Sequence, residues 1–124
     1  MSTNEQTIAF IGLGNMGAPM VANLCAKGFS VRACDVSTEA LHNAVKLGCE
    51  AFSSASAAVS GADVVLTMLP NGETVESLLI DEQCVLEEIP SNALLIDCST
   101  VSATTSLRVH QYADSLGVQC LDAP

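Results

Sequence analysis

The sequence predicts an α/β fold, in which a doubly wound, mostly parallel six-stranded sheet carries helices on both faces. Short apolar runs rich in β-branched residues alternate along the chain with stretches of helical pattern. Hydrophobic residues make up 49% of the chain but aromatic residues only 3%, which is typical of small and aliphatic side chains packed between helices and a parallel sheet. At 124 residues the chain has the length of one domain.

The apolar runs and the signals for helix ends place each element. Six strands are expected, at residues 7–11, 30–34, 50–52, 63–69, 93–98 and 118–121. Helices are expected at residues 18–27, 38–47, 54–60, 73–79 and 102–116, because a small polar residue or proline stands at or near the start of each range or glycine directly follows its end. Residues 80–91 are expected to form a loop with one short helix at residues 85–89. Since no repeat or linker interrupts this order, residues 1–124 are predicted to form a single domain.

Charge excludes some classes of partner. Fourteen acidic residues against four basic ones give a net charge of -10, which repels nucleic acids and anionic lipid surfaces. No apolar run approaches the roughly 20 residues that span a bilayer, and the first residues have no features of a signal or transit peptide. We therefore expect no nucleic-acid or membrane partner and a cytoplasmic location, with the mitochondrial matrix left open for a eukaryotic source.

Six cysteines are scattered along the chain without a CxxC pair or a cluster with histidine. This spacing predicts neither a metal site nor a redox dithiol. Free cysteines are usually small buried hydrophobes, and we expect the same of most of these six.

A glycine-rich turn directly follows the first predicted strand and opens the first helix. Gly12 permits the tight turn, Gly14 lets the backbone approach a pyrophosphate, and Gly17 lets the helix pack on the strand. The free N–H groups and positive dipole end of the helix favour the same anion. The sequence therefore predicts a dinucleotide-binding Rossmann domain. Its predicted cofactor-binding turn comprises Gly12, Leu13, Gly14, Asn15, Met16 and Gly17.

Asp35 follows the second predicted strand, about 20 residues beyond the turn, where an acid binds the adenosine ribose. Its carboxylate would accept hydrogen bonds from the ribose hydroxyls and repel a 2′-phosphate. Residues 36–38 offer no arginine or lysine to neutralise such a phosphate. NAD is therefore predicted in preference to NADP, while helix capping is the alternative role for Asp35.

Four segments resemble the β-hydroxyacid dehydrogenase family. Residues 10–20, Phe-Ile-Gly-Leu-Gly-Asn-Met-Gly-Ala-Pro-Met, are similar to its opening fingerprint. Residues 67–70 (Thr-Met-Leu-Pro) resemble the family's loop after the fourth strand, and residues 95–100 (Leu-Ile-Asp-Cys-Ser-Thr) its DxST segment. Residues 121–124 (Leu-Asp-Ala-Pro) look like the start of its substrate loop. The resemblance covers the chain from residue 7 onward.

The resemblance implies roles for further residues. Cofactor contacts are implied for Met68, Leu69, Pro70, Thr74 and Thr100, and substrate contacts for Ser99, Thr100 and Asp122. The residues alone support one cleft, because Gly12, Asp35, Pro70, Ser99 and Asp122 each follow a predicted strand at the same sheet edge. Helix capping is the alternative for Ser99, Thr100 and Ser102. For Met16 and Met20, packing is favoured over substrate contact.

The resemblance also implies an activity. The family passes a hydride from a small 3-hydroxy acid, such as 3-hydroxyisobutyrate, to NAD, and a lysine beyond the substrate loop accepts the proton. That position lies beyond Pro124, so no catalytic residue is assigned in this chain. Lys27 and Lys46 are expected to offset helix dipoles. His42 and His110 fall within predicted helices and are expected to be exposed, and Arg108 to be solvated.

Two hypotheses follow for the function. In the first, the chain is the NAD-binding domain of an oxidoreductase, truncated before a C-terminal helical domain and inactive alone, with a hydroxy acid substrate and a homo-oligomeric assembly. In the second, it is a free-standing, non-catalytic nucleotide-binding module or sensor subunit. The first hypothesis is favoured, because the sequence stops in the middle of the segment that resembles the substrate loop.

Overall fold

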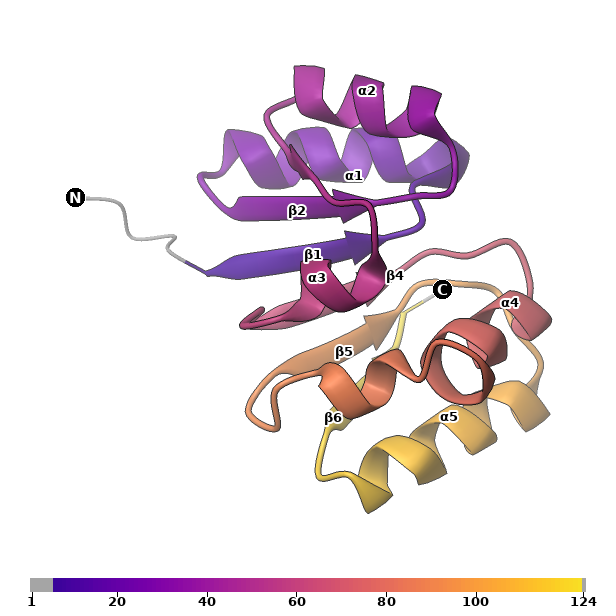
Figure 1. The fold of residues 1–124 in the computed structure, drawn as a ribbon. Helices are drawn as coiled ribbons and strands as arrows, with labels where there is room; N and C mark the ends of the chain where they lie inside the picture. Colours follow the sequence, from indigo (N-terminus) through magenta and orange to yellow (C-terminus); the bar gives the residue numbers. More distant parts are fainter. Residues whose placement is uncertain (1–5, 124) are drawn as a thin grey trace.

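The computed structural model describes residues 6–123, with residues 14–16 described in backbone only. Its sheet has six strands in the order β3-β2-β1-β4-β5-β6, and every pairing is parallel (Figure 1). The strands are β1 (Thr7–Ile11), β2 (Ser30–Cys34), β3 (Glu50–Ala51), β4 (Val64–Thr67), β5 (Leu94–Asp97) and β6 (Gln119–Asp122). The predicted doubly wound, six-stranded sheet is confirmed.

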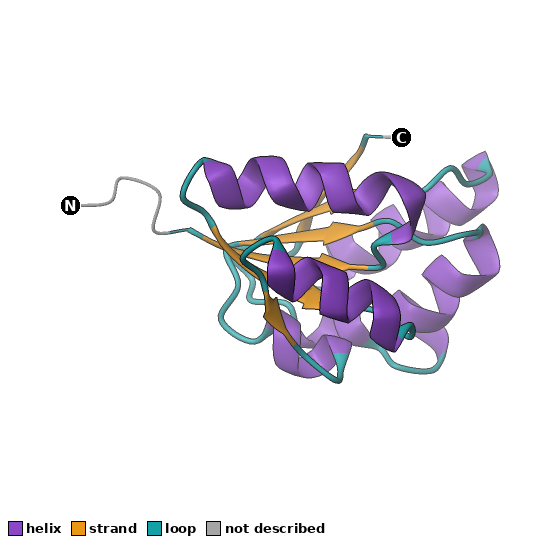
Figure 2. Cartoon of the chain, turned by 90° about the horizontal axis from the view of Figure 1, so that it is seen from above, coloured by secondary structure: helices purple, strands orange, loops and turns teal. Residues whose placement is uncertain are grey.

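Helices cover both faces of the sheet (Figure 2). They are α1 (Gly14–Ala26), α2 (Thr38–Lys46), α3 (Ala55–Val59), α4 (Gly72–Glu76) and α5 (Ala103–Ser115), with a π-helical turn η1 (Ser77–Asp81) and a 3-10 turn η2 (Val85–Glu88). None of the helices within residues 6–123 is both long and apolar enough to cross a membrane.

Alternate residues of β1 supply two separate cores, because successive side chains of a strand point to opposite faces. Ile8 and Phe10 pack in the cluster beneath α1 and α2, together with Val21 of α1. Ala9 and Ile11 pack in the cluster beneath α3, α4 and α5. Since β1 is central and buried on both faces, its position is fixed from both sides, and the turn that follows it is fixed as well.

Two predicted helix boundaries are wrong. The first helix begins at Gly14 rather than residue 18, because only Gly12 and Leu13 are needed to turn the chain out of β1. The helix expected at residues 73–79 is a single α-helical turn, α4, that widens into η1 and ends at Asp81, inside the expected loop. The wider turn lets Leu78 and Leu79 reach the core while Asp81 remains exposed.

The fourth strand is shorter than expected and ends at Thr67, although apolar residues continue to Leu69. The backbone N–H of Met68 still donates to the Ile11 carbonyl at 2.9 Å. The N–H of Leu69 instead donates to the Ser99 side chain at 2.8 Å. Because the Leu69 N–H leaves the β-ladder at this point, residues 69–70 turn out over the edge of the sheet.

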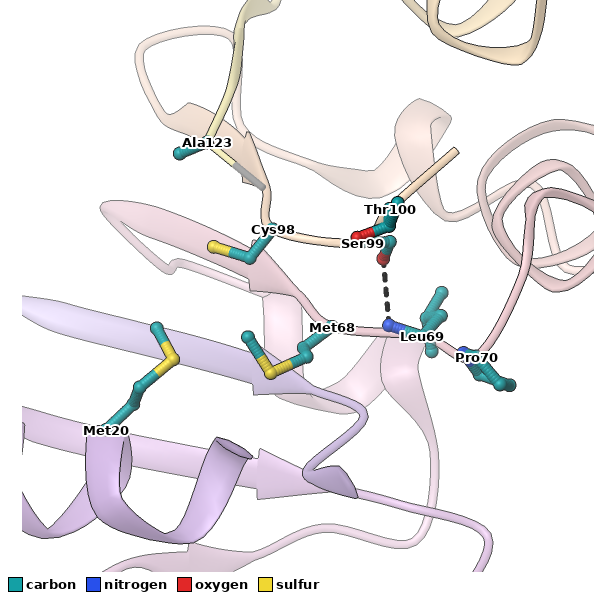
Figure 3. A pocket seen from close by; sticks show the side chains of 8 residues that line it. All are labelled: Met20, Met68, Leu69, Pro70, Cys98, Ser99, Thr100 and Ala123. Atoms are coloured by element: carbon teal, nitrogen blue, oxygen red, sulfur yellow. Dashed lines mark hydrogen bonds between the residues drawn. The ribbon is translucent and has the colours of Figure 1, made fainter. Parts of the chain in front are cut away.

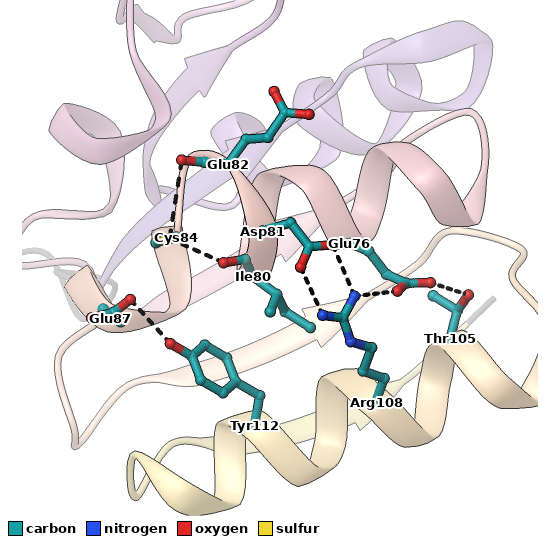
Figure 4. A network of polar contacts seen from close by, with 9 residues as sticks. All are labelled: Glu76, Ile80, Asp81, Glu82, Cys84, Glu87, Thr105, Arg108 and Tyr112. Carbon is teal, nitrogen blue, oxygen red and sulfur yellow. Dashed lines mark hydrogen bonds and ion pairs between the residues drawn. The ribbon is translucent and has the colours of Figure 1, made fainter.

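Arg108 is exposed, as expected from the sequence, and it also joins α5 to α4 and η1 (Figure 4). Its guanidinium pairs with Glu76 and makes two hydrogen bonds to Asp81, at 2.8 and 2.7 Å. Glu76 also accepts a hydrogen bond from the Thr105 hydroxyl at 2.7 Å. Hydrogen bonds from Arg108 are the main reason that the pKa values of both carboxyls lie below their usual range.

Replacing Arg108 by methionine is expected to lower the melting temperature by a few degrees at neutral pH. A carboxyl whose pKa is lowered on folding stabilises the fold above its unfolded pKa, and this stabilisation disappears as pH falls through the folded value. The difference between wild type and variant should therefore shrink below about pH 4, where unfolded Asp and Glu titrate. Thermal unfolding monitored by circular dichroism from pH 7 to pH 3 tests this.

Arg32→Met is the matched control for that experiment. Arg32 donates to the Ser60 carbonyl at 2.6 Å and lies over the Phe52 ring at 5.4 Å, and neither contact involves a carboxylate. Its effect should not change over the same acid range. A difference for Arg108→Met that persists undiminished at pH 3 would contradict the ion-pair explanation.

Candidate dinucleotide-binding site

The turn after β1 depends on the absence of a side chain at Gly12. Its φ is +83°, a left-handed conformation, and a Cβ at this position would lie 2.4 Å from the Met68 carbonyl oxygen. The Gly12 N–H donates to the Cys34 carbonyl at 2.8 Å. One residue therefore draws together the carboxyl ends of the three central strands, β2, β1 and β4.

Asp35, at the end of β2, holds the same turn. One carboxylate oxygen accepts the Leu13 N–H at 2.7 Å and the other accepts the Ser37 N–H at 2.8 Å. Ser37, rather than Asp35, is the side-chain cap of α2, because its hydroxyl accepts the Ala40 N–H at 3.2 Å. Asp35 is half-buried, and each of its carboxylate oxygens has a second lone pair. It can therefore hold the turn and still accept hydrogen bonds from ligand hydroxyls.

The start of α1 differs from the starts of the other four α-helices. A side-chain oxygen caps each of those four, from Ser37, Ser54, Asn71 and Ser102. The residue before α1, Leu13, offers no side-chain cap. The first N–H groups of a helix have no partner within it, and with the dipole they favour an anion. The turn, the uncapped helix and Asp35 thus lie together at one sheet edge.

Gly17, the last glycine of the predicted turn, packs closely against β1 and Leu13. A Cβ on Gly17 would lie 3.2 Å from the Leu13 Cβ and 3.5 Å from a ring carbon of Phe10 in β1. That close approach agrees with the helix-packing role expected for Gly17. The predicted side-chain contacts of Asn15 and Met16 lie outside the described side chains.

A cavity of about 490 Å³ opens at the carboxyl ends of β4 and β5 (Figure 3). Figure 3 shows residues 68–70 on one side and residues 98–100 on the other. The lining residues are Met20, Met68, Leu69, Pro70, Cys98, Ser99, Thr100 and Ala123. The structure thus brings five of the residues named by the family resemblance, Met68, Leu69, Pro70, Ser99 and Thr100, to one cavity.

Met20 both packs against the core and lines this cavity, whereas the sequence favoured packing alone. From α1 its side chain extends across β1 toward Met68 (Figure 3). The sequence carried a weak signal for this role, because Met20 belongs to the same fingerprint as the glycine turn.

A buried polar cluster ties the two cavity loops to each other. The Ser99 hydroxyl oxygen accepts the Leu69 N–H at 2.8 Å, and the Ser99 N–H donates to Asp97 at 3.0 Å. The Thr67 hydroxyl donates to the same Asp97 oxygen at 2.9 Å. Thr67, Asp97 and Ser99 are all buried. No local pattern in the sequence predicts a role for Thr67 or Asp97, because the two partners lie 30 residues apart in the chain.

Replacing Ser99 by alanine is expected to lower the free energy of unfolding by about 1–3 kcal/mol, because the Leu69 N–H loses its acceptor. The same variant should bind a dinucleotide less tightly, since residues 68–70 are released from residues 98–100. Urea unfolding and calorimetric titration measure the two effects. Thr100→Ala is the control, because Thr100 is exposed and should leave the urea midpoint unchanged. Equal midpoints for wild type and Ser99→Ala would contradict this role.

Thr74 and Asp122 are not among the residues that line this cavity, although Asp122 directly precedes the lining residue Ala123. The N–H and hydroxyl of Thr74 both donate to the Asn71 side chain at 2.9 Å, in the cap of α4. Asp122 lies against α5, where it accepts a hydrogen bond from the Ser106 hydroxyl and lies 3.2 Å from the His110 ring nitrogen. The Ser106 hydrogen bond is the main cause of its lowered pKa, followed by His110. The contacts predicted for both residues stay predictions.

The described residues offer no obvious general base at the cavity. His110 lies at the surface with 37% of its side chain exposed and faces Asp122, and His42 is exposed on α2. Burial is the main reason that the pKa of the Cys98 thiol is raised, so this cavity cysteine stays protonated near neutral pH. Within residues 6–123, no group of three or more His, Cys, Asp or Glu side chains is placed to hold a metal ion.

The order of the strands, the glycine turn after β1 and the acid after β2 define a Rossmann-type dinucleotide-binding domain, with its site where the strand order reverses between β1 and β4. A family profile described as the NAD binding domain of 6-phosphogluconate dehydrogenase matches residues 7–124. The chain belongs to this family of NAD-binding domains.

Two relatives confirm the resemblance to hydroxyacid dehydrogenases. A probable 3-hydroxyisobutyrate dehydrogenase of Mycobacterium tuberculosis is 49% identical over 118 residues, which cover 95% of this chain and 39% of that protein. An NAD-dependent L-serine dehydrogenase of Pseudomonas aeruginosa is 43% identical over 117 residues, which cover 94% of this chain and 39% of that protein. The chain thus spans about two fifths of the length of these relatives.

A solved structure has the same fold as this chain. The structure of M. tuberculosis 3-hydroxyisobutyrate dehydrogenase with L-serine superposes with a TM-score of 0.91 at 48% identity, over 97% of this chain and 40% of that one. The match supports the strand order and the loop positions described above.

Proposed function

We propose that the chain is the NAD-binding part of a dehydrogenase that oxidises a small 3-hydroxy acid, such as 3-hydroxyisobutyrate. The observation that carries the proposal is the cavity formed by residues 68–70 and 98–100, which opens at the same sheet edge as the glycine turn and Asp35. The names of the relatives support the substrate class, because 3-hydroxyisobutyrate and L-serine both carry a hydroxyl on the carbon two bonds from the carboxylate.

The residues present fit a bound NAD. The uncapped start of α1 offers N–H donors to the pyrophosphate, and Asp35 has lone pairs free for the ribose hydroxyls. The negative charge of Asp35 supports NAD over NADP, since a 2′-phosphate would lie against a carboxylate. Leu69 and Pro70 supply an apolar wall for the nicotinamide, and Ser99 and Thr100 supply hydroxyls beside it. NAD, when bound, supplies the acceptor of a hydride.

The chain's own residues bind and orient, and we assign the proton transfer to a lysine outside this chain. Lys27 and Lys46 lie at the ends of α1 and α2, at the sheet edge opposite the cavity. His110 is held by Asp122 against α5. The 124-residue chain alone is therefore expected to bind NAD and to show no measurable turnover. We also propose a homo-oligomeric, cytoplasmic enzyme.

The test is the intact mass of the endogenous protein together with activity. A mass larger than 12.8 kDa by at least another domain, and NAD reduction by that protein with 3-hydroxyisobutyrate or L-serine, is the expected result. A mass near 12.8 kDa would instead favour the second candidate, a free-standing nucleotide-binding module. Reduction of NAD by the 124-residue chain alone would overturn the proposal that the proton acceptor lies outside it.

A further inference from the structure

Two cysteines distant in sequence lie in contact on the face of the sheet covered by α1 and α2. The sulfurs of Cys25, in the last turn of α1, and Cys49, directly before β3, are 3.9 Å apart. Both are free thiols. Gly48, whose φ of +107° favours glycine, packs beside the pair, and a Cβ there would be in ordinary contact with the Cys25 Cβ at 3.5 Å.

We propose that Cys25 and Cys49 form a disulfide when the protein meets a two-electron oxidant such as hydrogen peroxide. The two residues differ in access: Cys25 is half-buried, whereas Cys49 is only 7% exposed. Peroxide therefore reaches Cys25 first, and Cys49 is the partner that completes the bond. The geometry supports the bond itself, since the sulfurs are already in contact although the two residues lie 24 positions apart in the chain.

The chemistry balances with one peroxide for each bond. The Cys25 thiol is oxidised to a sulfenic acid as peroxide is reduced to one water. The Cys49 sulfur then attacks the Cys25 sulfur; the S–S bond forms, the S–O bond breaks, and the oxygen leaves as a second water. Burial is the main reason that the pKa of Cys49 is raised to about 12, so the second step should accelerate with pH as more thiolate forms.

The position of the pair predicts the consequences. Parallel strands begin at one sheet edge and end at the other, and α1 returns from the second edge to the first. Cys25 and Cys49 therefore lie at the edge where the strands begin, opposite Gly12 and Asp35. The disulfide would join α1 to the start of β3 and enclose α2 in its loop. It should stabilise that part of the fold and leave the dinucleotide site intact.

In the test, the reduced chain is treated with excess hydrogen peroxide at pH 7 and at pH 8.5. Its peptides are then mapped by mass spectrometry under non-reducing conditions. The expected product is a Cys25–Cys49 linked peptide pair, formed faster at the higher pH, with loss of two hydrogens from the intact mass and reversal by dithiothreitol. The melting temperature should rise by about 5 °C or more, since cross-linking restricts the unfolded chain. Affinity for NAD should change by less than about twofold.

Three variants complete the design. Cys25→Ala and Cys49→Ala should each abolish the linked peptide, and the first remains informative if removing the buried Cys49 prevents folding. Cys84→Ser is the matched control, because Cys84 is also half-buried but donates to the Ile80 carbonyl at 3.0 Å, on the other face of the sheet. It should leave the link intact. Oxidation that yields sulfinic acid at Cys25, or links between other cysteines, would overturn the proposal.

Discussion

Replacing Gly12 by alanine is expected to lower the free energy of unfolding by about 2–5 kcal/mol. A left-handed backbone costs an L-residue about 1–2 kcal/mol, and forcing a methyl group into a packed position adds about 1–3 kcal/mol. The added Cβ would lie 2.4 Å from the Met68 carbonyl oxygen and 2.6 Å from a Leu69 methyl carbon. Since the obstacle is backbone, it cannot be relieved by a change of rotamer. Urea unfolding measures the loss.

Gly61→Ala is the matched control, because it separates backbone strain from steric overlap. Gly61 also has a left-handed φ, +73°, but a Cβ there would meet no atom within 4 Å. This variant should cost only the backbone contribution, about 1–2 kcal/mol. Gly12→Ala should also weaken NAD binding, whereas Gly61→Ala should not. Equal losses of stability in the two variants would show that the approach of Met68 to the turn is not needed by the fold.

The strands and the glycine turn could be predicted because their causes are local. An apolar, β-branched run bounded by turn residues predicts a strand wherever its partners lie, and all six runs became strands. The end of β4 could not be found in this way. Leu69 is as apolar as its neighbours, and only the Ser99 hydroxyl, 30 residues away, draws its N–H out of the ladder.

The same distinction explains the candidate site. The family resemblance identified the loop residues that meet at the cavity, but not the contacts that hold them. Thr67 and Asp97 show no pattern in sequence, since they act through each other across two strands. Arg108 is exposed as expected, but its ion pairs with Glu76 and Asp81 could not be predicted, because the sequence did not show the helix as continuing to Asp81.

The ratio of NAD to NADP affinity should exceed about tenfold in the wild-type chain and fall by about tenfold or more in Asp35→Asn. A hydrogen bond to a charged group contributes about 1.5–3 kcal/mol, and each 1.4 kcal/mol is a factor of ten in affinity. Loss of the carboxylate weakens the ribose hydrogen bonds of NAD and removes the repulsion of a 2′-phosphate. Both changes move the ratio in the same direction. Calorimetric titration of each variant with both cofactors measures it.

The ratio is a sharper measurement than either affinity because Asp35 also supports the turn. Asp35 accepts the Leu13 and Ser37 N–H groups through two different oxygens, whereas an asparagine has only one side-chain oxygen. Asp35→Asn should therefore loosen the turn and weaken the binding of both cofactors together. That loss cancels in the ratio within one variant. Asp63→Asn is the control, because Asp63 also accepts a backbone N–H, from Thr7 at 2.8 Å, but at the opposite sheet edge. An unchanged ratio in Asp35→Asn, with weaker binding of both cofactors, would mean that Asp35 supports the turn and does not contact the ribose.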